Sequence, residues 1–261
     1  MSTAALNPKG PRIVKPGTGA AEWTQTYLAS SVGQKILVGV TGFGLVTFVI
    51  FHLIGNLKIF SGPESLNKYA YFLKHDLGAL IWIARAGLLG AFVLHVVLAV
   101  RLKLRAAASR PVNYVASRAV QATPQSLTMV YTGFVVLMFV IFHLAHFTFA
   151  WVHEAQTPSG TINYLSMVDK DGRHHVYNMM VAGFHTPWIA VLYLVAQLFL
   201  FIHLAHGIQS VFQTLGLIAK RFVPAVQMLG WGISGLILAG NTAIVAAVWL
   251  GYVKEVPGFS Q

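Results

Sequence analysis

Six histidines lie within long apolar segments of the sequence, where an ionisable or metal-binding side chain is costly and marks function by default. They are His52, His95, His143, His146, His203 and His206. Because the chain contains no cysteine, imidazole is the main side-chain ligand that it can offer to a metal or a cofactor. The lack of cysteine also excludes disulfides, iron–sulfur ligation and covalent haem attachment by this chain.

Four of these histidines fall at matching depths. His52 and His143 lie about 16 residues, or roughly 24 Å of helix, after the starts of the first and third apolar segments. His95 and His203 lie equally far into the second and fourth segments, which run in the opposite direction. The first pair therefore shares a level in the outer half of an apolar core about 30 Å thick, and the second pair shares a level in the inner half.

Two histidines at one depth on different helices can bind the two faces of one haem iron. Two such pairs predict two b-type haems stacked across the membrane, and bis-histidine ligation favours electron transfer over oxygen chemistry. The alternative for any single histidine is a hydrogen bond between helices, but four histidines at two matched depths favour haem ligation. Glycines in the first two segments would leave room for the flat ring, although close helix packing explains them equally well: Gly39, Gly42, Gly44, Gly87 and Gly90.

Two of the six histidines follow a proposed ligand by three residues. His146 follows His143 in the string FHLAH, and His206 follows His203 in the string IHLAH. A spacing of three keeps both members on nearly the same helix face, so depth leaves open which member binds iron. The other member would hydrogen-bond a haem propionate or a quinone, or serve a structural role.

The elements that must position these histidines are membrane helices. The chain has 261 residues, of which 56% are hydrophobic and only 10% charged, and its mean hydropathy is +0.66. Five segments reach the roughly 20 apolar residues that a membrane helix needs. We expect an all-α membrane protein whose five helices form a haem-binding bundle, with spans at 36–57, 77–100, 127–152, 187–212 and 225–250.

The expected organisation has three parts. Residues 1–30 form a cytoplasmic N-terminal arm, residues 31–253 form the five-helix di-haem cytochrome b domain, and residues 254–261 form an external C-terminal tail. The connection at 154–185 is long for a simple loop, which predicts an external cap or functional loop.

Charge predicts the orientation. One side of the five spans receives eleven basic residues and one acidic residue, and the other side receives seven basic and six acidic residues. The positive-inside rule therefore places the N-terminus and the second and fourth connections in the cytoplasm. The basic excess is attracted to anionic lipid or an acidic partner, and its position between apolar spans disfavours nucleic acid as a partner. The sequence has no phosphate-binding loop, nucleophile elbow or HExxH motif.

Several motifs resemble the cytochrome b subunit of succinate dehydrogenase/fumarate reductase in its five-helix, two-haem form. They are SSVGQKILVGVTGFG at 30–44, FHLIGNL at 51–57, ARAG at 84–87, LHV at 94–96, FVIFHL at 139–144, FIHLAHGIQS at 201–210 and QTLG at 213–216. The resemblance covers most of residues 30–216. It implies a membrane anchor that carries electrons between an iron–sulfur subunit and quinone, in a complex whose flavoprotein subunit handles succinate.

The resemblance also implies which histidines bind iron. The matching positions are His52 with His143 at the distal haem and His95 with His203 at the proximal haem. It thereby favours His143 over His146 and His203 over His206. The implied setting is the inner membrane of a bacterium, with menaquinone as the expected quinone and an assembly of three whole complexes as a further expectation.

Three other residues bear on the haems and the quinone. Arg85, at the outer end of the second span, is expected to pair with a haem propionate, and snorkelling to headgroups is the alternative. Some members of the family carry a glutamate two residues before the fourth ligand as part of a proton path, where this chain has Phe201. Glu64 is then the nearest acidic candidate for proton exchange at a quinone site near the distal haem, and a merely solvated loop glutamate is the alternative.

Two other functions remain open. One is a cytochrome b anchor of another respiratory enzyme, such as a hydrogenase or formate dehydrogenase. The other is a transporter that uses membrane histidines as a proton relay. Co-purification with a succinate-oxidising flavoprotein distinguishes a succinate dehydrogenase anchor from the first alternative. A colourless purified protein identifies the second alternative.

Overall fold

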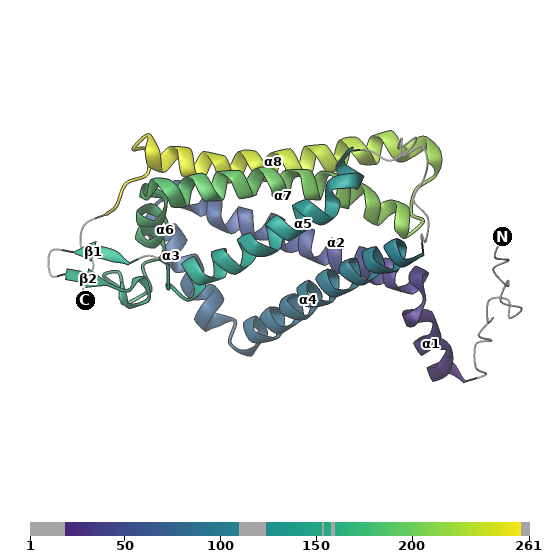
Figure 1. Cartoon of the computed structure of the whole chain (residues 1–261). Coiled ribbons are helices and arrows are strands. Elements are labelled where there is room, and N and C mark those ends of the chain that lie inside the picture. Colours follow the sequence, from purple (N-terminus) through teal and green to yellow (C-terminus); the bar gives the residue numbers. More distant parts are fainter. Residues whose placement is uncertain (1–18, 110–123, 153, 158–159, 257–261) are drawn as a thin grey trace, which may run out of the picture.

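The computed structural model describes residues 19–109, 124–152, 154–157 and 160–256, and the regular elements among them are helices apart from one short hairpin (Figure 1). Five helices are long and apolar enough to cross a membrane. They are α2 (Ser31–Asn56), α4 (Ala79–Ala108), α5 (Pro124–His143), α7 (Pro187–Thr214) and α8 (Val223–Trp249). The expected all-α architecture with five candidate membrane spans is confirmed.

The shorter elements gather at the two ends of the five long helices. The remaining elements are α1 (Ala20–Ala29), η1 (Leu57–Ser61), α3 (Pro63–Tyr71), η2 (Phe72–Asp76), η3 (Leu144–Thr148), β1 (Ala155–Thr157), β2 (Gly160–Ile162), η4 (Tyr164–Ser166), α6 (Val176–His185) and η5 (Lys220–Phe222). Helices α3 and α6 and the hairpin lie at one end, which we call the cap end, and α1 lies at the other, the α1 end (Figure 1).

The long helices pack around α2 and α7. Helix α7 contacts α2, α5 and α8, whereas α4 packs mainly on α2. Helices α7 and α8 approach closely because α8 has small residues at the contact: a Cβ added to Gly230 would lie 2.7 Å from the Ala205 carbonyl oxygen. Helix α4 buries only Leu98 and exposes most of its apolar side chains, as expected of a helix that faces lipid.

Local signals account for several helix ends. Helix α2 begins after Ser30, whose Oγ accepts a hydrogen bond from the Gly33 amide at 3.0 Å. Helix α7 begins at Pro187, whose missing amide hydrogen costs nothing in the first turn. Helix α5 ends at His143 and continues as one π-helical turn to Thr148, before Ala150 adopts a positive φ of 50°.

The boundaries differ from the expected ones in four places, and the first is that α2 begins at Ser31, before the expected start at residue 36. The third span was expected to continue to residue 152, but its π turn and the left-handed Ala150 end it earlier. The second span runs on to Ala108, because residues 101–108 are good helix formers that leave the apolar region. The expected arm at 1–30 contains α1, and the expected connection at 154–185 contains a hairpin and α6.

Candidate functional site

His52 and His143 meet near the cap end. His52 lies in the last turns of α2 and His143 is the final residue of α5. Their imidazole centroids are 5.7 Å apart, with the rings nearly perpendicular at 89°. One turn before each histidine lies a phenylalanine in ring contact with it, Phe48 at 5.4 Å and Phe139 at 5.9 Å. We call His52 and His143 the cap-end pair.

A tyrosine of α7 contacts the cap-end pair from one side. The Tyr193 hydroxyl lies 3.2 Å from Nδ1 of His143 and 3.0 Å from Nδ1 of His146. Tyr193 is buried among aromatic rings that include Phe139 and Phe184. The hydroxyl therefore links the two histidines of the FHLAH string through their Nδ1 atoms.

The other two histidines each lie against a glycine of a neighbouring helix. The Cε1 atom of His95, on α4, lies 3.1 Å from where a Cβ of Gly42 on α2 would stand. The Cε1 atom of His203, on α7, lies 3.3 Å from the corresponding position at Gly133 on α5. Each of these rings thus lies against a helix that carries a histidine of the cap-end pair, ten residues before that histidine. We call His95 and His203 the α1-end pair.

The two pairs occupy two levels along the bundle. On α2, Gly42 marks the α1-end level and His52 the cap-end level, ten residues further on. On α5, Gly133 and His143 are separated by the same ten residues. Ten residues of α-helix correspond to about 15 Å, which is half of an apolar core about 30 Å thick. The four histidines thus lie at two levels, each built by two helices.

The pairs can be compared with the requirements of a metal held between two imidazoles. Imidazole nitrogen binds metals at about 2 Å, so two imidazoles on opposite sides of one iron have ring centroids on the order of 6 Å apart. The 5.7 Å of the cap-end pair is close to this separation. At the α1-end pair, Gly42 and Gly133 leave the space beside each ring that any side chain would fill. The residues present therefore fit bis-histidine ligation.

The second histidines of the FHLAH and IHLAH strings, His146 and His206, have different environments from His143 and His203. His146 is fully buried, and its Nε2 lies 3.1 Å from where a Cβ of Gly183 in α6 would stand. It therefore faces α6 and not α2, whereas His143 faces His52. His206 lies one turn closer to the α1 end than His203 and is half-buried.

Arg85 stands apart from all four paired histidines. It lies near the cap end of α4, where its guanidinium stacks over the Trp82 ring with 4.9 Å to the centroid. Its side chain is exposed, and no carboxylate among the described residues pairs with it. Outside the spans, burial and then the charge of Arg85 lower the pKa of Lys74, so the two cations lie close together.

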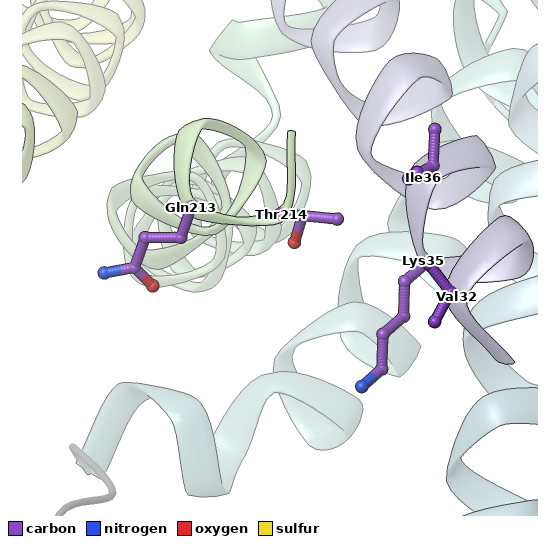
Figure 2. A pocket seen from close by; sticks show the side chains of 5 residues that line it. All are labelled: Val32, Lys35, Ile36, Gln213 and Thr214. Atoms are coloured by element: carbon purple, nitrogen blue, oxygen red, sulfur yellow. The ribbon is translucent and has the colours of Figure 1, made fainter. Parts of the chain in front are cut away.

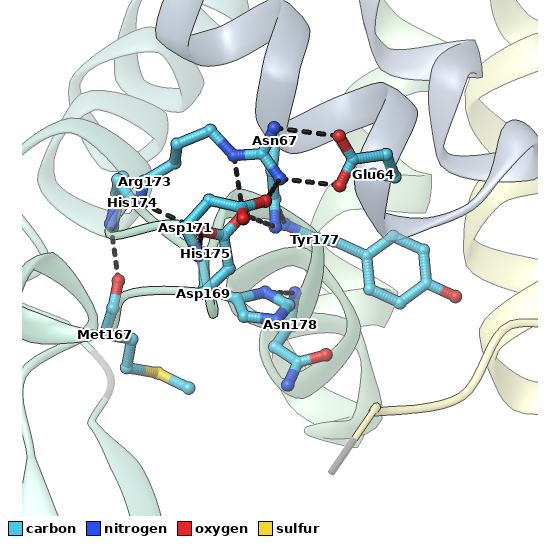
Figure 3. Close-up of polar contacts among 10 residues, drawn as sticks. All are labelled: Glu64, Asn67, Met167, Asp169, Asp171, Arg173, His174, His175, Tyr177 and Asn178. Carbon is cyan, nitrogen blue, oxygen red and sulfur yellow. Dashed lines mark hydrogen bonds and ion pairs between the residues drawn. The ribbon is translucent and has the colours of Figure 1, made fainter. Parts of the chain in front are cut away.

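Glu64 belongs to an ion-pair cluster that joins α3 to the loop before α6 (Figure 3). Arg173 donates to both Glu64 oxygens, at 2.9 and 2.6 Å, and also pairs with Asp169 and Asp171. The hydrogen bond from Arg173 is the main cause that lowers the pKa of Glu64. Asn67 completes the connection, since it donates to Asp169 and accepts from the Tyr177 amide.

An open cavity of about 270 Å³ lies at the α1 end between α2 and α7. Figure 2 shows the Lys35 side chain extending beside it, with Gln213 and Thr214 on the opposite wall. These groups offer an ammonium, an amide and a hydroxyl at the end of the bundle where Gly39 approaches Thr214. A polar headgroup or a carboxylate is the kind of group that such a lining suits.

Comparison with protein-family models, with curated proteins and with solved structures finds no match to this chain. The residues themselves therefore carry any functional argument.

The sequence reasoning missed three side chains that touch the histidines: Tyr193, Thr41 and Thr132. An internal repeat could have revealed the two threonines. Residues 41–53 (TGFGLVTFVIFHL) and 132–144 (TGFVVLMFVIFHL) are identical at nine of thirteen positions. We call these segments the TGF repeat. Each copy begins with a Thr-Gly pair and ends just past a histidine of the cap-end pair.

Proposed function

We propose that this protein is the cytochrome b membrane anchor of a succinate:quinone oxidoreductase. The observation that supports it best is the contact of His52 with His143 at one level, with His95 and His203 held against Gly42 and Gly133 one level closer to the α1 end. Each level would hold one b-type haem, with the four named histidines as axial ligands. The motifs that resemble the family's cytochrome b subunit lie on the helices that carry these pairs.

The histidines suit electron transfer because one imidazole would bind each face of the haem iron at each level. A haem with two imidazole ligands supplies one-electron transfer and keeps no open position for oxygen. Within each level, this chain's residues hold the imidazoles and exclude water, because the rings lie between apolar spans. The two levels, about 15 Å apart, provide a path for electrons through half of the membrane.

The partners follow from the charges. With the basic connections in the cytoplasm, the α1 end would face an iron–sulfur subunit, and electrostatic attraction would orient that docking. A flavoprotein subunit of the same complex would oxidise succinate, because this chain has no cysteine for clusters and no nucleotide-binding motif. Quinone, with menaquinone as the first candidate, would exchange electrons in the bilayer of the bacterial cytoplasmic membrane.

The roles of the remaining predicted residues can be narrowed. Because His146 faces α6, it acts as a structural neighbour of His143, and His143 is the proposed ligand. The ion pair to Arg173 holds Glu64 in its charged form, which suits a structural role in the cap better than proton exchange. Arg85, exposed at the cap end, remains the proposed partner of a haem propionate.

One observation favours a different function, a proton relay. Tyr193 connects His143 and His146 in a hydrogen-bonded chain, which is the kind of path that a proton needs. A relay needs no haem, so it predicts a colourless protein. A cytochrome b anchor of a hydrogenase or formate dehydrogenase would be coloured but would not associate with a succinate-oxidising flavoprotein.

The test is the haem content of the purified protein. We expect two haems b per chain by pyridine haemochrome assay, and one haem after His95→Ala or His203→Ala. His75→Ala is the matched control, because His75 is exposed and lies outside the five spans. A colourless wild-type protein, or equal haem content in all three variants, would refute the proposal.

A further inference from the structure

Both copies of the TGF repeat place a threonine at Nδ1 of an α1-end histidine. The Oγ1 atom of Thr41 lies 3.3 Å from Nδ1 of His95, and the Oγ1 atom of Thr132 lies 3.3 Å from Nδ1 of His203. The threonines come from α2 and α5, and the histidines come from α4 and α7. The repeat therefore builds the same contact twice, between different helices.

The hydrogen bonds of Thr41 define the tautomer of His95. The Thr41 hydroxyl donates to the Leu37 carbonyl at 2.7 Å, so its hydrogen is already engaged. Nδ1 of His95 also lies 3.2 Å from the Val38 carbonyl oxygen, which can only accept. Nδ1 must therefore carry the proton and donate to both oxygens, and Nε2 keeps its lone pair.

The second copy repeats this arrangement. The Thr132 hydroxyl donates to the Met129 carbonyl at 3.1 Å, three residues earlier, so its hydrogen is also engaged within its own helix. Because that hydrogen is engaged, the Thr132 oxygen can only accept from Nδ1 of His203, which lies 3.3 Å away. His203 is thus held as the same tautomer as His95, with Nε2 available.

The glycine after each threonine completes the contact. A Cβ at Gly42 or Gly133 would lie 3.1 or 3.3 Å from the Cε1 atom of the same histidine. Most real Cβ contacts are longer, at 3.4–4 Å, so only glycine lets the ring approach the helix as it does. The threonine thus determines that Nδ1 of the imidazole carries the proton, and the glycine determines how closely the imidazole approaches the neighbouring helix.

The cap-end pair has a different environment. Nδ1 of His143 contacts the Tyr193 hydroxyl, and the ring of His52 stacks on Phe48. Changes to the two threonines should therefore act on the α1-end level alone.

We propose that Thr41-Gly42 and Thr132-Gly133 form a duplicated positioning motif that holds His95 and His203 with Nδ1 protonated and Nε2 free to bind one shared iron. This inference rests on the proposed haem-binding function. A metal-bound histidine commonly donates its other ring N–H to an acceptor, which orients the ring and raises its basicity. Loss of the acceptor should therefore weaken the stabilisation of ferric iron and raise the reduction potential of the α1-end haem.

The experiment is a redox titration of the full-length protein in membranes, followed by absorbance, for Thr41→Val, Thr132→Val and the double variant. Each single variant should change the ferric-to-ferrous ratio at a given potential about threefold, a positive shift of about 28 mV at 59 mV per tenfold. The shift should be confined to the haem that His95→Ala removes. Thr41→Ser and Thr132→Ser, which keep the hydroxyl, should behave as wild type.

Thr47→Val is the matched control on α2, because Thr47 is half-buried and the hydrogen bond of its hydroxyl goes to the Phe43 carbonyl of its own helix and to no histidine. Loss of the α1-end haem in a valine variant but not in its serine counterpart also supports the motif. Two normal haems with unshifted potentials in the double variant would overturn this inference and leave the proposed function intact. A wild-type protein without haem would overturn both.

Discussion

Gly42→Ala is the substitution whose effect can best be worked out from the structure. The new Cβ would lie 3.1 Å from Cε1 of His95, which is at least about 0.3 Å inside ordinary contact, since that begins at 3.4 Å. Overpacking of this kind costs about 1–3 kcal/mol. If the cost is paid by the bound state alone, the haem affinity of the α1-end site falls about 5- to 150-fold. The cap-end site, about 15 Å away, should keep its affinity.

The assay is haem titration of the purified apoprotein, with reduced-minus-oxidised spectra to resolve the two sites. Gly133→Ala should act on the same site more weakly, because its Cβ would lie 3.3 Å from His203. Gly232→Ala on α8 is the matched control, since nothing lies within 4 Å of its added Cβ. If Gly42→Ala binds two haems as tightly as Gly232→Ala does, His95 is not held against α2 in the haem-bound protein, and the reasoning is refuted.

Three further predictions concern other parts of the molecule. Tyr193→Phe removes the hydroxyl that contacts Nδ1 of His143 and should shift the spectrum or potential of the cap-end haem alone; a shift of both haems by the same amount would contradict this. Hydrogen bonds from Arg173 lower the pKa of Glu64, and at Asp169 they outweigh the effect of burial and lower its pKa as well. Both carboxylates therefore stabilise the folded protein above about pH 4. This stabilisation is lost as the pH falls through their folded-state pKa values. The protection of residues 163–185 against hydrogen exchange, measured relative to free amides at the same pH, should accordingly fall in acid, and Arg173→Gln should show the reduced protection already at pH 7. Lys103→Glu at the α1 end should weaken co-purification with the iron–sulfur subunit, most strongly at low salt, whereas Lys170→Glu at the cap end should not.

The spans could be predicted from the sequence because bilayer thickness imposes a length and a composition that few other structures share. All five long helices overlap the expected segments. The cap could not be predicted in this way. Helix α6 buries most of its residues on both faces, so it lacks the one-sided pattern that identifies a surface helix. The end of α5 depends on a π turn, and hydropathy continues past it unchanged.

The sequence could predict the depth of each histidine, since helix rise converts residue number into height. Depth placed His52 with His143, and these rings are in contact. Depth alone could not separate His143 from His146, because their spacing of three leaves both on nearly one face; packing against Gly183 distinguishes them. Thr41 and Thr132 were missed because a lone threonine in a span carries no signal. Only their equivalent places in the TGF repeat would have singled them out.

The central claim is tested most directly by an experimental structure of the purified complex in its membrane-derived lipid. The account predicts density for two haems, with one iron about 2 Å from Nε2 of both His95 and His203 and the other from Nε2 of both His52 and His143. Their Nδ1 atoms should keep the contacts to Thr41, Thr132 and Tyr193. A structure with no iron at either level, or with iron bound by His146 or His206, would contradict the account.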